Sequence, residues 1–476
     1  MREPRFSVVI PTRERPETLR HTLRTCLRQD FDDFEVIVSD NGRTSATREL
    51  VRELADPRVR CVSTPRPLAM SANFEHAVGY ASGEYLLVIG DDDGLLPFCL
   101  REIDTLVRRT GAKIVRWIPA TYTWPGIALE GQGNYLGVPL ARGLRAADGR
   151  EEIRRALATW DYAGLPMLYV NAAVHREVID GIRGNAGRVF GCRVPDVYSG
   201  FVLGYISGQF LAVTVPLTVA GVSGSSTGVS VLFREAAGEV SRDFVNLNAE
   251  CGYFPHPHVP DLPLFPVTPM AESFLRAKDA FFPNDETLVL PRLTILEMCA
   301  KSLWVEDDEL RAQFFDTIRD SARDDTELLG AFDSAFPGPP PAVRAPRLRQ
   351  ALLGSDGDNL HLDASRFGVM DVEGAADLTA RLLGVGQGPL RYDLQTRAEE
   401  MTQRTGELAG QVERTHLRLI AEQRSNDRLR TTVASLQEGV EQANRMIGVA
   451  QLTLNGAWSC LPYRVVRWMR GRLAGT

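Results

Sequence analysis

The chain has 476 residues, of which 44% are hydrophobic and 24% charged, and its net charge is −7. This is the composition of a globular protein of two to four domains, and the acidic balance argues against nucleic acid as a partner. No run approaches the roughly 18 apolar residues of a membrane span, the start lacks the apolar stretch of a signal peptide, and the seven cysteines form no CxxC pair. We therefore expect a cytoplasmic protein with reduced thiols.

Strand and helix patterns alternate over the first 120 residues. Short apolar runs, typical of strands buried on both faces, occupy residues 6–10, 34–40, 59–64, 85–90 and 113–118. Apolar residues at helical spacing predict helices that begin near residues 16, 46, 70 and 97. The alternation predicts an α/β fold, a doubly wound and mostly parallel sheet with helices on both faces.

The remaining chain changes character several times. We expect a first domain over residues 1–235, followed by a mainly helical accessory region over 236–390. A proline-rich stretch, "FPGPPPAVRAP", interrupts the second region at 336–346.

A heptad pattern begins at Leu394 and continues to Ala450, with apolar residues at thirteen of seventeen core positions. It predicts a coiled coil over 391–456 that joins chains into a homo-oligomer, although a single helix packed on its own domain fits the same periodicity. The tail, 457–476, interleaves arginines with aromatic residues and reads as a basic amphipathic segment. Such a tail suits peripheral contact with the anionic inner face of a membrane, and a helix docked on the protein is the alternative.

Polar residues follow three of the predicted strands. The segments are "PTRER" (11–15), "SDNG" (39–42) and "GDDDG" (90–94). Ligands of such sheets bind beyond the carboxyl ends of the strands, so these segments are expected to form one pocket. Three adjacent aspartates repel one another, and either a divalent cation with oxygen ligands or plain solvent at a loop would offset this.

These segments occur in the order "SVVIPTRERPETL", "DFEVIVSDNG" and "NFEHAVGYASGEYLLVIGDDDGLLP". In this order and spacing the sequence resembles the family-2 glycosyltransferases with the GT-A fold, closely over about residues 5–120 and loosely to about 230. The resemblance implies that 1–235 is a catalytic GT-A domain that transfers a sugar from a nucleotide-sugar donor with inversion. It also implies that Mg²⁺ or Mn²⁺ is the cofactor.

The resemblance assigns roles by position. Residues expected to contact the nucleotide are Thr12, Glu14, Asp40, Asn73 and Asp91. Residues expected to hold the metal are Asp92 and Asp93. The family's usual D-x-D-D pattern places Gly90 at its first aspartate, so Asp91 paired with Asp93 is an alternative metal pair. Arg13 and Glu14 also depart from the family's usual aromatic residue and asparagine, which leaves the nucleotide open.

Transfer to a hydroxyl group requires a general base. The family places a carboxylate for this purpose after the donor half of the domain, and Asp196 in "RVPDVYSG" is the best match. The alternatives are that Asp196 only caps a helix, or that Asp161 in "TWDYAG" is the base.

Other segments have weaker functional interpretations. "GVSGSSTG" (221–228) could contact the diphosphate or acceptor, or be a surface loop. One of His256 and His258 could add a metal ligand, or the "PHPH" segment could be merely extended. Aromatic residues that could stack on an acceptor sugar, or simply pack in the core, are Trp117, Tyr122 and Trp124.

The sequence thus predicts an inverting glycosyltransferase whose acceptor is a glycan or a lipid-linked saccharide in cell-surface glycan synthesis. Two alternatives are a nucleotidyltransferase and a non-catalytic coiled-coil scaffold with a nucleotide-binding domain. The absence of glycine from "PTRER" disfavours the first, and the intact aspartates disfavour the second.

Overall fold

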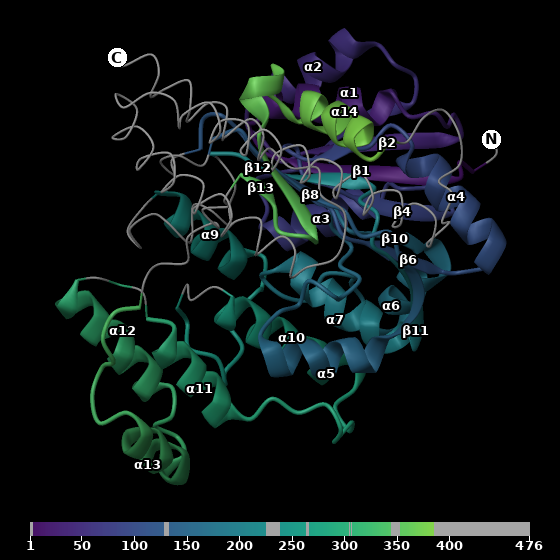
Figure 1. The fold of residues 1–476 in the computed structure, drawn as a ribbon. Coiled ribbons are helices and arrows are strands. Elements are labelled where there is room, and N and C mark those ends of the chain that lie inside the picture. Colours follow the sequence, from purple (N-terminus) through teal and green to yellow (C-terminus); the bar gives the residue numbers. More distant parts are fainter. Residues whose placement is uncertain are drawn as a thin grey trace, which may run out of the picture.

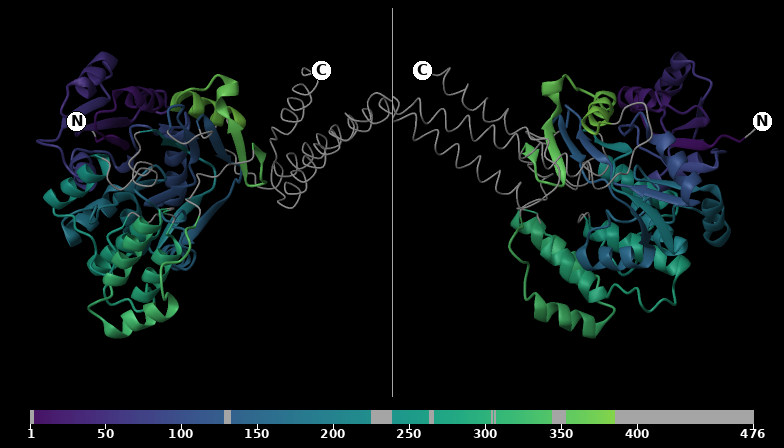
Figure 2. Two further views of the ribbon diagram at one scale, coloured as in Figure 1. Left: turned by 90° about the vertical axis from the view of Figure 1, so that its left-hand side faces the viewer. Right: turned by 45° about the vertical axis from the view of Figure 1, so that its right-hand side comes forward.

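The computed structural model describes residues 3–127, 133–224, 239–262, 266–303, 305, 307–343 and 353–384 (Figure 1). This part of the chain contains two sheets with helices packed against them. Three helices project from the sheets at one end (Figures 1 and 2), and they are α11 (Arg292–Lys301), α12 (Asp308–Asp320) and α13 (Thr326–Ala335). The predicted coiled coil and basic tail lie outside the described residues.

The main sheet has eight strands in the order β3-β2-β1-β4-β10-β6-β11-β9. Its first four strands are parallel, whereas β10 runs antiparallel to both neighbours and β9 is antiparallel to β11. The bounds are β1 Phe6–Thr12, β2 Phe34–Asp40, β3 Val59–Ser63, β4 Tyr85–Val88, β6 Ile114–Trp117, β9 Leu144–Asp148, β10 Ala172–His175 and β11 Gln209–Val213. The predicted α/β fold is confirmed, with a mixed sheet.

Strand β1 shows why its sequence is a continuous apolar run. Successive side chains of a strand point to opposite faces of the sheet. Val9 enters one core cluster, whereas Val8 and Ile10 enter the other, and all three are fully buried. Because helices cover both faces of the sheet, every side chain of this strand is buried, which explains why most of its residues are apolar.

Helices cover each face of the main sheet. The face that receives Val8 packs against α1 (Pro16–Leu27), α2 (Ala46–Leu54), α4 (Cys99–Thr110) and α14 (Val372–Leu382). The face that receives Val9 packs against α3 (Met70–Val78), α5 (Gly149–Thr159), α6 (Arg176–Ala186), α7 (Pro195–Ser207) and α10 (Val267–Phe281). The four helices predicted in the first 120 residues are therefore all present.

Helix α1 illustrates how the sequence sets these helices. Pro16 is its first residue, where a missing N–H costs nothing. Leu19, Leu23 and Cys26 follow at helical spacing and are fully buried. The helix thereby holds the segment that follows β1 at a fixed place above the sheet.

A second sheet lies beside the first, with six strands in the order β13-β14-β8-β7-β12-β5. The bounds are β5 Gly94–Leu95, β7 Ala120–Thr123, β8 Tyr135–Pro139, β12 Thr218–Val222, β13 Gly354–Ser355 and β14 Asn359–Asp363. Strand β5 begins directly after the three aspartates and pairs with β12. This sheet therefore forms one wall of the edge where the polar segments meet.

The segment 353–384 belongs to this second sheet. Strand β14 pairs with β8 over five residues, and a short 3-10 helix, Ala364–Phe367, leads into α14. Helix α14 lies on α1, where Arg28 bonds both Glu373 and Asp377. Sequence reasoning placed this segment in a mainly helical accessory region, because two short strands leave little signal without their partners. The proposed domain division remains a prediction.

Two observations complete the fold. Helix α9, residues Glu239–Glu250, crosses near the polar edge, where Arg66 pairs with Glu250 and Arg13 with Asp243. Among the described residues, none of the helices combines the length and apolar character needed to cross a bilayer.

Leu360 tests whether the distant segment stabilises the whole domain. Its side chain is 1% exposed in β14, so Leu360→Ala should lower the free energy of unfolding by about 2–5 kcal/mol. Phe367, which is 54% exposed in the same segment, is the control, and Phe367→Ala should change stability by less than about 0.5 kcal/mol. Equal effects of the two substitutions in urea denaturation would contradict this assignment.

Candidate active site

Three polar strand ends meet at the carboxyl edge of the main sheet. Thr12 and Asp40, the last residues of β1 and β2, are register partners. Asp91, two residues beyond Ile89 on the β4 side, accepts a hydrogen bond from the Thr12 hydroxyl at 2.5 Å. The structure therefore brings together the segments after β1, β2 and β4, as the parallel arrangement predicts.

Asp91, Asp92 and Asp93, named here the aspartate turn, are almost completely buried. Asp91 also receives the Arg15 guanidinium at 3.2 Å. Burial lowers the pKa of Arg15, but the charges of Asp91 and Asp92 outweigh it and raise the pKa overall. One arginine thus compensates part of a concentrated negative charge.

Asp92 and Asp93 are held by donors from the second sheet. The Ser223 hydroxyl donates to Asp92 Oδ2 at 2.6 Å, and the Ser223 N–H reaches the same oxygen at 3.3 Å. The backbone N–H groups of Gly221 and Gly90 donate to the two oxygens of Asp93, at 2.7 and 2.6 Å. Asp92 Oδ1 has no hydrogen bond within the described part of the chain, so it is the oxygen best placed to accept a ligand.

The aspartate turn is electrostatically strained. Burial and the neighbouring Asp91 charge raise the pKa of Asp92 to about 6. Burial and the charge of Asp92 raise the pKa of Asp93 to about 8. Carboxylates in this state gain from a nearby cation, and Mg²⁺ and Mn²⁺ prefer such oxygen donors. The residues present therefore fit a divalent metal.

Gly90 accounts for the departure from the family's aspartate pattern. A Cβ atom on Gly90 would lie 2.5 Å from the Tyr169 hydroxyl and 3.0 Å from Asp92 Oδ1. An aspartate at this position would therefore require the Tyr169 side chain and the neighbouring carboxylates to move.

Asp196 lies in the first turn of α7 and is partly exposed. Residue Val194 is the cap of this helix, so the interpretation of Asp196 as the cap is wrong. Burial raises the pKa of Asp196 against the backbone N–H groups of its own turn. The pKa of Tyr169 is raised by burial and by the charges of Asp93, Asp92 and Asp196, which places Asp196 near the aspartate turn.

Glu14 and Asp40 organise the loop above β1 and β2. Glu14 has φ of +57° and accepts hydrogen bonds from the Thr44 hydroxyl at 2.6 Å and the Thr44 N–H at 3.0 Å. Asp40 is 1% exposed and accepts hydrogen bonds from Arg48 at 2.8 Å and from the Gly42 N–H at 3.1 Å. Both carboxylates accept hydrogen bonds from residues 42–44 and so hold this turn in place. Their contact with a nucleotide remains a prediction.

Asn73 is buried on α3, where its Oδ1 accepts a hydrogen bond from the Ser39 hydroxyl at 2.7 Å. It thereby positions the end of β2. Asp161 is exposed, lies 3.7 Å from Arg155, and accepts a hydrogen bond from the Ala163 N–H. The geometry favours Asp196 over Asp161 as the acid beside the aspartate turn.

The aromatic residues divide between core and site. Trp117 and Tyr122 are fully buried, whereas Trp124 is partly exposed and donates to the Asp92 carbonyl at 3.0 Å. His256 contacts Asp279 at 3.2 Å, and no described contact joins it or His258 to the aspartate turn.

A second group of possible metal ligands lies between α1 and α14. His21, Asp371 and Glu373 bring their ligand atoms within 4.8 Å of one another. Arg24 and Arg28 already pair with Glu373, which compensates its charge. We therefore interpret this group as ion pairs that hold α14 against α1 and not as a metal site.

Sequence reasoning missed four residues that build the site. Arg15 and Tyr169 lie against the aspartate turn, and Gly221 and Ser223 bond its carboxylates. The last two stand in the "GVSGSSTG" segment, whose small polar residues after a strand were the available signal. Residues 225–228 of that segment lie outside the described residues.

Comparison with known proteins agrees with this geometry. Residues 7–122 match the model described as Glycosyl transferase family 2. This part of the chain, from β1 to β7, is therefore similar to the family-2 glycosyltransferases.

Individual relatives cover short stretches. GalNAc(5)-diNAcBac-PP-undecaprenol beta-1,3-glucosyltransferase of Campylobacter jejuni is 32% identical over 96 residues, 20% of this chain and 31% of that protein. Validoxylamine A glucosyltransferase of Streptomyces hygroscopicus is 51% identical over 55 residues, 11% of this chain and 13% of that protein. In both cases the matching part spans less than a third of the relative's own length.

Solved structures are more distant. S. aureus TarS 1-349 in complex with UDP-GlcNAc is 12% identical, with 70% of this chain and 91% of that chain covered and a TM-score of 0.38. A likeness at this level supports no inference about ligands.

The aspartate turn predicts different effects for its members. Asp92→Ala removes the carboxylate with a free oxygen, and we expect Mn²⁺-dependent binding of nucleoside diphosphates to fall at least tenfold. Asp93→Asn leaves one backbone N–H unbonded, so we expect a loss of about 1–3 kcal/mol in stability. Calorimetric titration with UDP and GDP, with and without EDTA, measures the first effect and urea denaturation the second. Wild-type nucleotide affinity in both Asp92→Ala and Asp93→Ala would rule out a metal at this turn.

Proposed function

We propose that this protein is an inverting, metal-dependent glycosyltransferase of the GT-A type. Its donor is a nucleotide-sugar and its acceptor a glycan or a lipid-linked saccharide in cell-surface glycan synthesis. The observation that carries the proposal is the buried aspartate turn, which lies at the same sheet edge as Thr12 and Asp40 and near Asp196. The family match over residues 7–122 supports the same activity.

Asp92 would hold Mg²⁺ or Mn²⁺ through its free oxygen, with Asp91 or Asp93 as the second carboxylate. When bound, the metal stabilises the negative charge that develops on the departing nucleoside diphosphate. Arg15, 3.2 Å from Asp91, adds a fixed positive charge beside the same place. Ser223 and Gly221 keep the carboxylates aimed, so little reorganisation is needed when charge develops.

Asp196 would act as the general base. A raised pKa strengthens a carboxylate as a proton acceptor, provided that the group is ionised at the working pH. The Tyr169 side chain, which interacts electrostatically with both Asp196 and the aspartate turn, would separate the base from the metal ligands. The acceptor hydroxyl would then be deprotonated as it attacks the sugar from the face opposite the nucleotide.

The Campylobacter relative is named for an acceptor linked through diphosphate to undecaprenol, which supports a lipid-linked acceptor here. A nucleotidyltransferase is less well supported, because Arg13, Glu14 and Arg15 occupy the loop after β1 where a glycine-rich phosphate loop would be needed.

Asp196→Asn tests the base. The amide cannot accept the proton, so we expect turnover to fall about a hundredfold or more while donor binding is retained. Because the pKa of Asp196 is raised, wild-type turnover at saturating Mn²⁺ and donor should be lost as the pH falls, at a pH above the ordinary range for aspartate. The variant should lack this acid limb.

The matched control for this experiment is Asp161→Asn, which should retain near-normal turnover. A normal rate in Asp196→Asn together with a large loss in Asp161→Asn would move the base to Asp161.

The C-terminal segments carry a separate proposal from sequence alone. The heptad pattern over 391–456 would join chains into a homo-oligomer, and the basic tail over 457–476 would hold the enzyme at an anionic membrane surface. A chain that ends at Leu390 should lose both the oligomer and binding to phosphatidylglycerol vesicles, yet still hydrolyse donor. Light scattering and vesicle flotation measure these properties, and an unchanged oligomer with unchanged vesicle binding would refute the proposal.

A further inference from the structure

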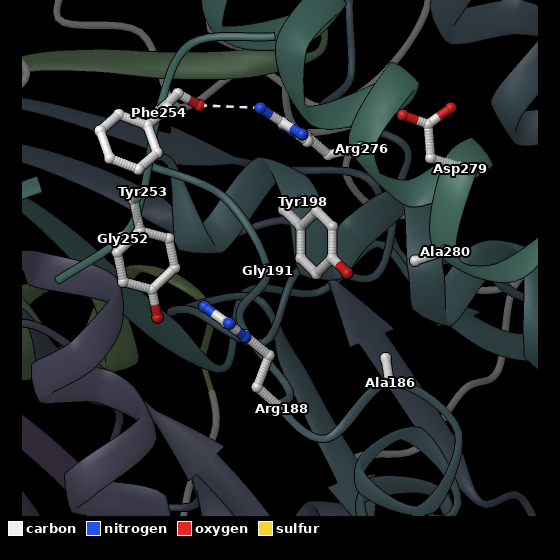
Figure 3. Close-up of a pocket in the computed structure, with 10 residues that line it drawn as sticks. All are labelled: Ala186, Arg188, Gly191, Tyr198, Gly252, Tyr253, Phe254, Arg276, Asp279 and Ala280. Carbon is white, nitrogen blue, oxygen red and sulfur yellow. Dashed lines mark hydrogen bonds between the residues drawn. The ribbon is translucent and has the colours of Figure 1, made fainter. Parts of the chain in front are cut away.

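A pocket of about 400 Å³ lies beside α7, and none of its described lining residues belongs to the aspartate turn. The end of α6, the loop before α7, the turn after α9 and the second half of α10 contribute to it (Figure 3). Its chemically distinctive lining residues are Arg188, Tyr198, Tyr253, Phe254, Arg276 and Asp279.

The two arginines leave positive charge in this pocket. Arg188 lies over the Tyr253 ring at 5.3 Å and makes no ion pair with a carboxylate of the described chain. Arg276 donates to the carbonyl groups of Phe254 and Pro255, both at 3.0 Å, which leaves its charge uncompensated. The one acid among the described lining residues, Asp279, contacts His256 at 3.2 Å, but burial lowers the pKa of His256, so the carboxylate keeps its charge and the lining holds two arginines against one acid. The pocket therefore favours an anionic ligand.

Tyr198 supplies a hydroxyl to the lining of the pocket. The residue as a whole is 2% exposed, and its hydroxyl is not among the buried polar atoms that lack a partner, so this oxygen is open to solvent or to a ligand. Figure 3 shows this hydroxyl directed toward the middle of the pocket. A Cβ atom on Gly191 would lie 2.4 Å from the hydroxyl, so the small residue at 191 makes room for it. A hydroxyl that lines a pocket can donate a hydrogen bond to an oxygen atom of a bound ligand.

Aromatic rings complete the lining. Phe254 is 58% exposed and stands beside Tyr253 at the mouth of the pocket. Exposed aromatic faces next to polar donors suit a sugar ring, whose C–H groups pack on aromatic faces while its hydroxyls bond to polar groups. Guanidinium groups, in turn, match a carboxylate through paired N–H donors.

We propose that this pocket binds a uronic acid unit of the acceptor glycan, with Arg188 and Arg276 on its carboxylate and Tyr198 on an adjacent oxygen. This deepens the proposed function and rests on it. The loop that forms one wall of the pocket continues directly into Asp196, and Tyr198 follows Asp196 by two residues in α7. Residues two apart point to nearly opposite sides of a helix, so Tyr198 and Asp196 face different sides of α7. The pocket would therefore bind a sugar unit of the acceptor other than the one that reacts.

The test uses the full chain and defined probes. Calorimetry should detect binding of tetragalacturonate or tetramannuronate, and at least tenfold weaker binding of their methyl esters, which lack the charge. Arg188→Ala should weaken uronate binding at least tenfold, Arg188→Lys should recover part of it, and Tyr198→Phe should weaken it severalfold. The control is Arg108→Ala, on α4 at the opposite face of the sheet, which should change nothing.

Any one of several results would overturn the proposal. They are equal binding of uronates and esters, failure of both uronates to bind, and full displacement of the uronate by an equal concentration of inorganic phosphate. Wild-type uronate affinity in both Arg188→Ala and Tyr198→Phe would do the same. Mn²⁺-dependent UDP and GDP binding is measured on the same samples, because its loss would count against the proposed function, whereas its retention without uronate binding counts against this pocket alone.

Discussion

The site depends on the burial of three adjacent carboxylates in one tight turn. Such a turn is unstable unless donors surround it, and here the donors include residues from two distant parts of the chain. Thr12 and Arg15 supply them from the end of β1, and Gly221 and Ser223 from the second sheet. The main and second sheets are therefore tied together at the residues that would perform the chemistry.

This dependence makes small residues as important as charged ones. A Cβ atom on Gly221 would lie 1.7 Å from the Asp92 carbonyl, and one on Gly90 would collide with Tyr169. At these two positions only glycine lets the backbone come this close, and the backbone N–H groups of the two glycines donate to Asp93. The position of the second sheet, completed by the distant residues 353–384, thus sets the shape of the site.

Charge is segregated across α7. On one side, Asp196 and the aspartate turn concentrate negative charge, with Arg15 as the nearby compensating cation. In the pocket beside Tyr198, Arg188 and Arg276 outnumber the one acid among the described lining residues, Asp279. A metal and a nucleotide suit the first side, whereas an anionic part of a larger substrate suits the second. One short helix would then connect chemistry and acceptor recognition.

The sequence by itself determined the α/β fold and predicted which strand ends and which aspartates form the candidate site, because apolar runs and the residues after them are local signals. It also predicted Asp196 as the acid to consider. Only the tertiary structure decided that backbone N–H groups donate to both oxygens of Asp93, that the Tyr169 hydroxyl fills the space beside Gly90, and that residues 353–384 join the second sheet. These facts depend on atoms far apart in the chain, and no local pattern records which distant groups meet when the chain folds.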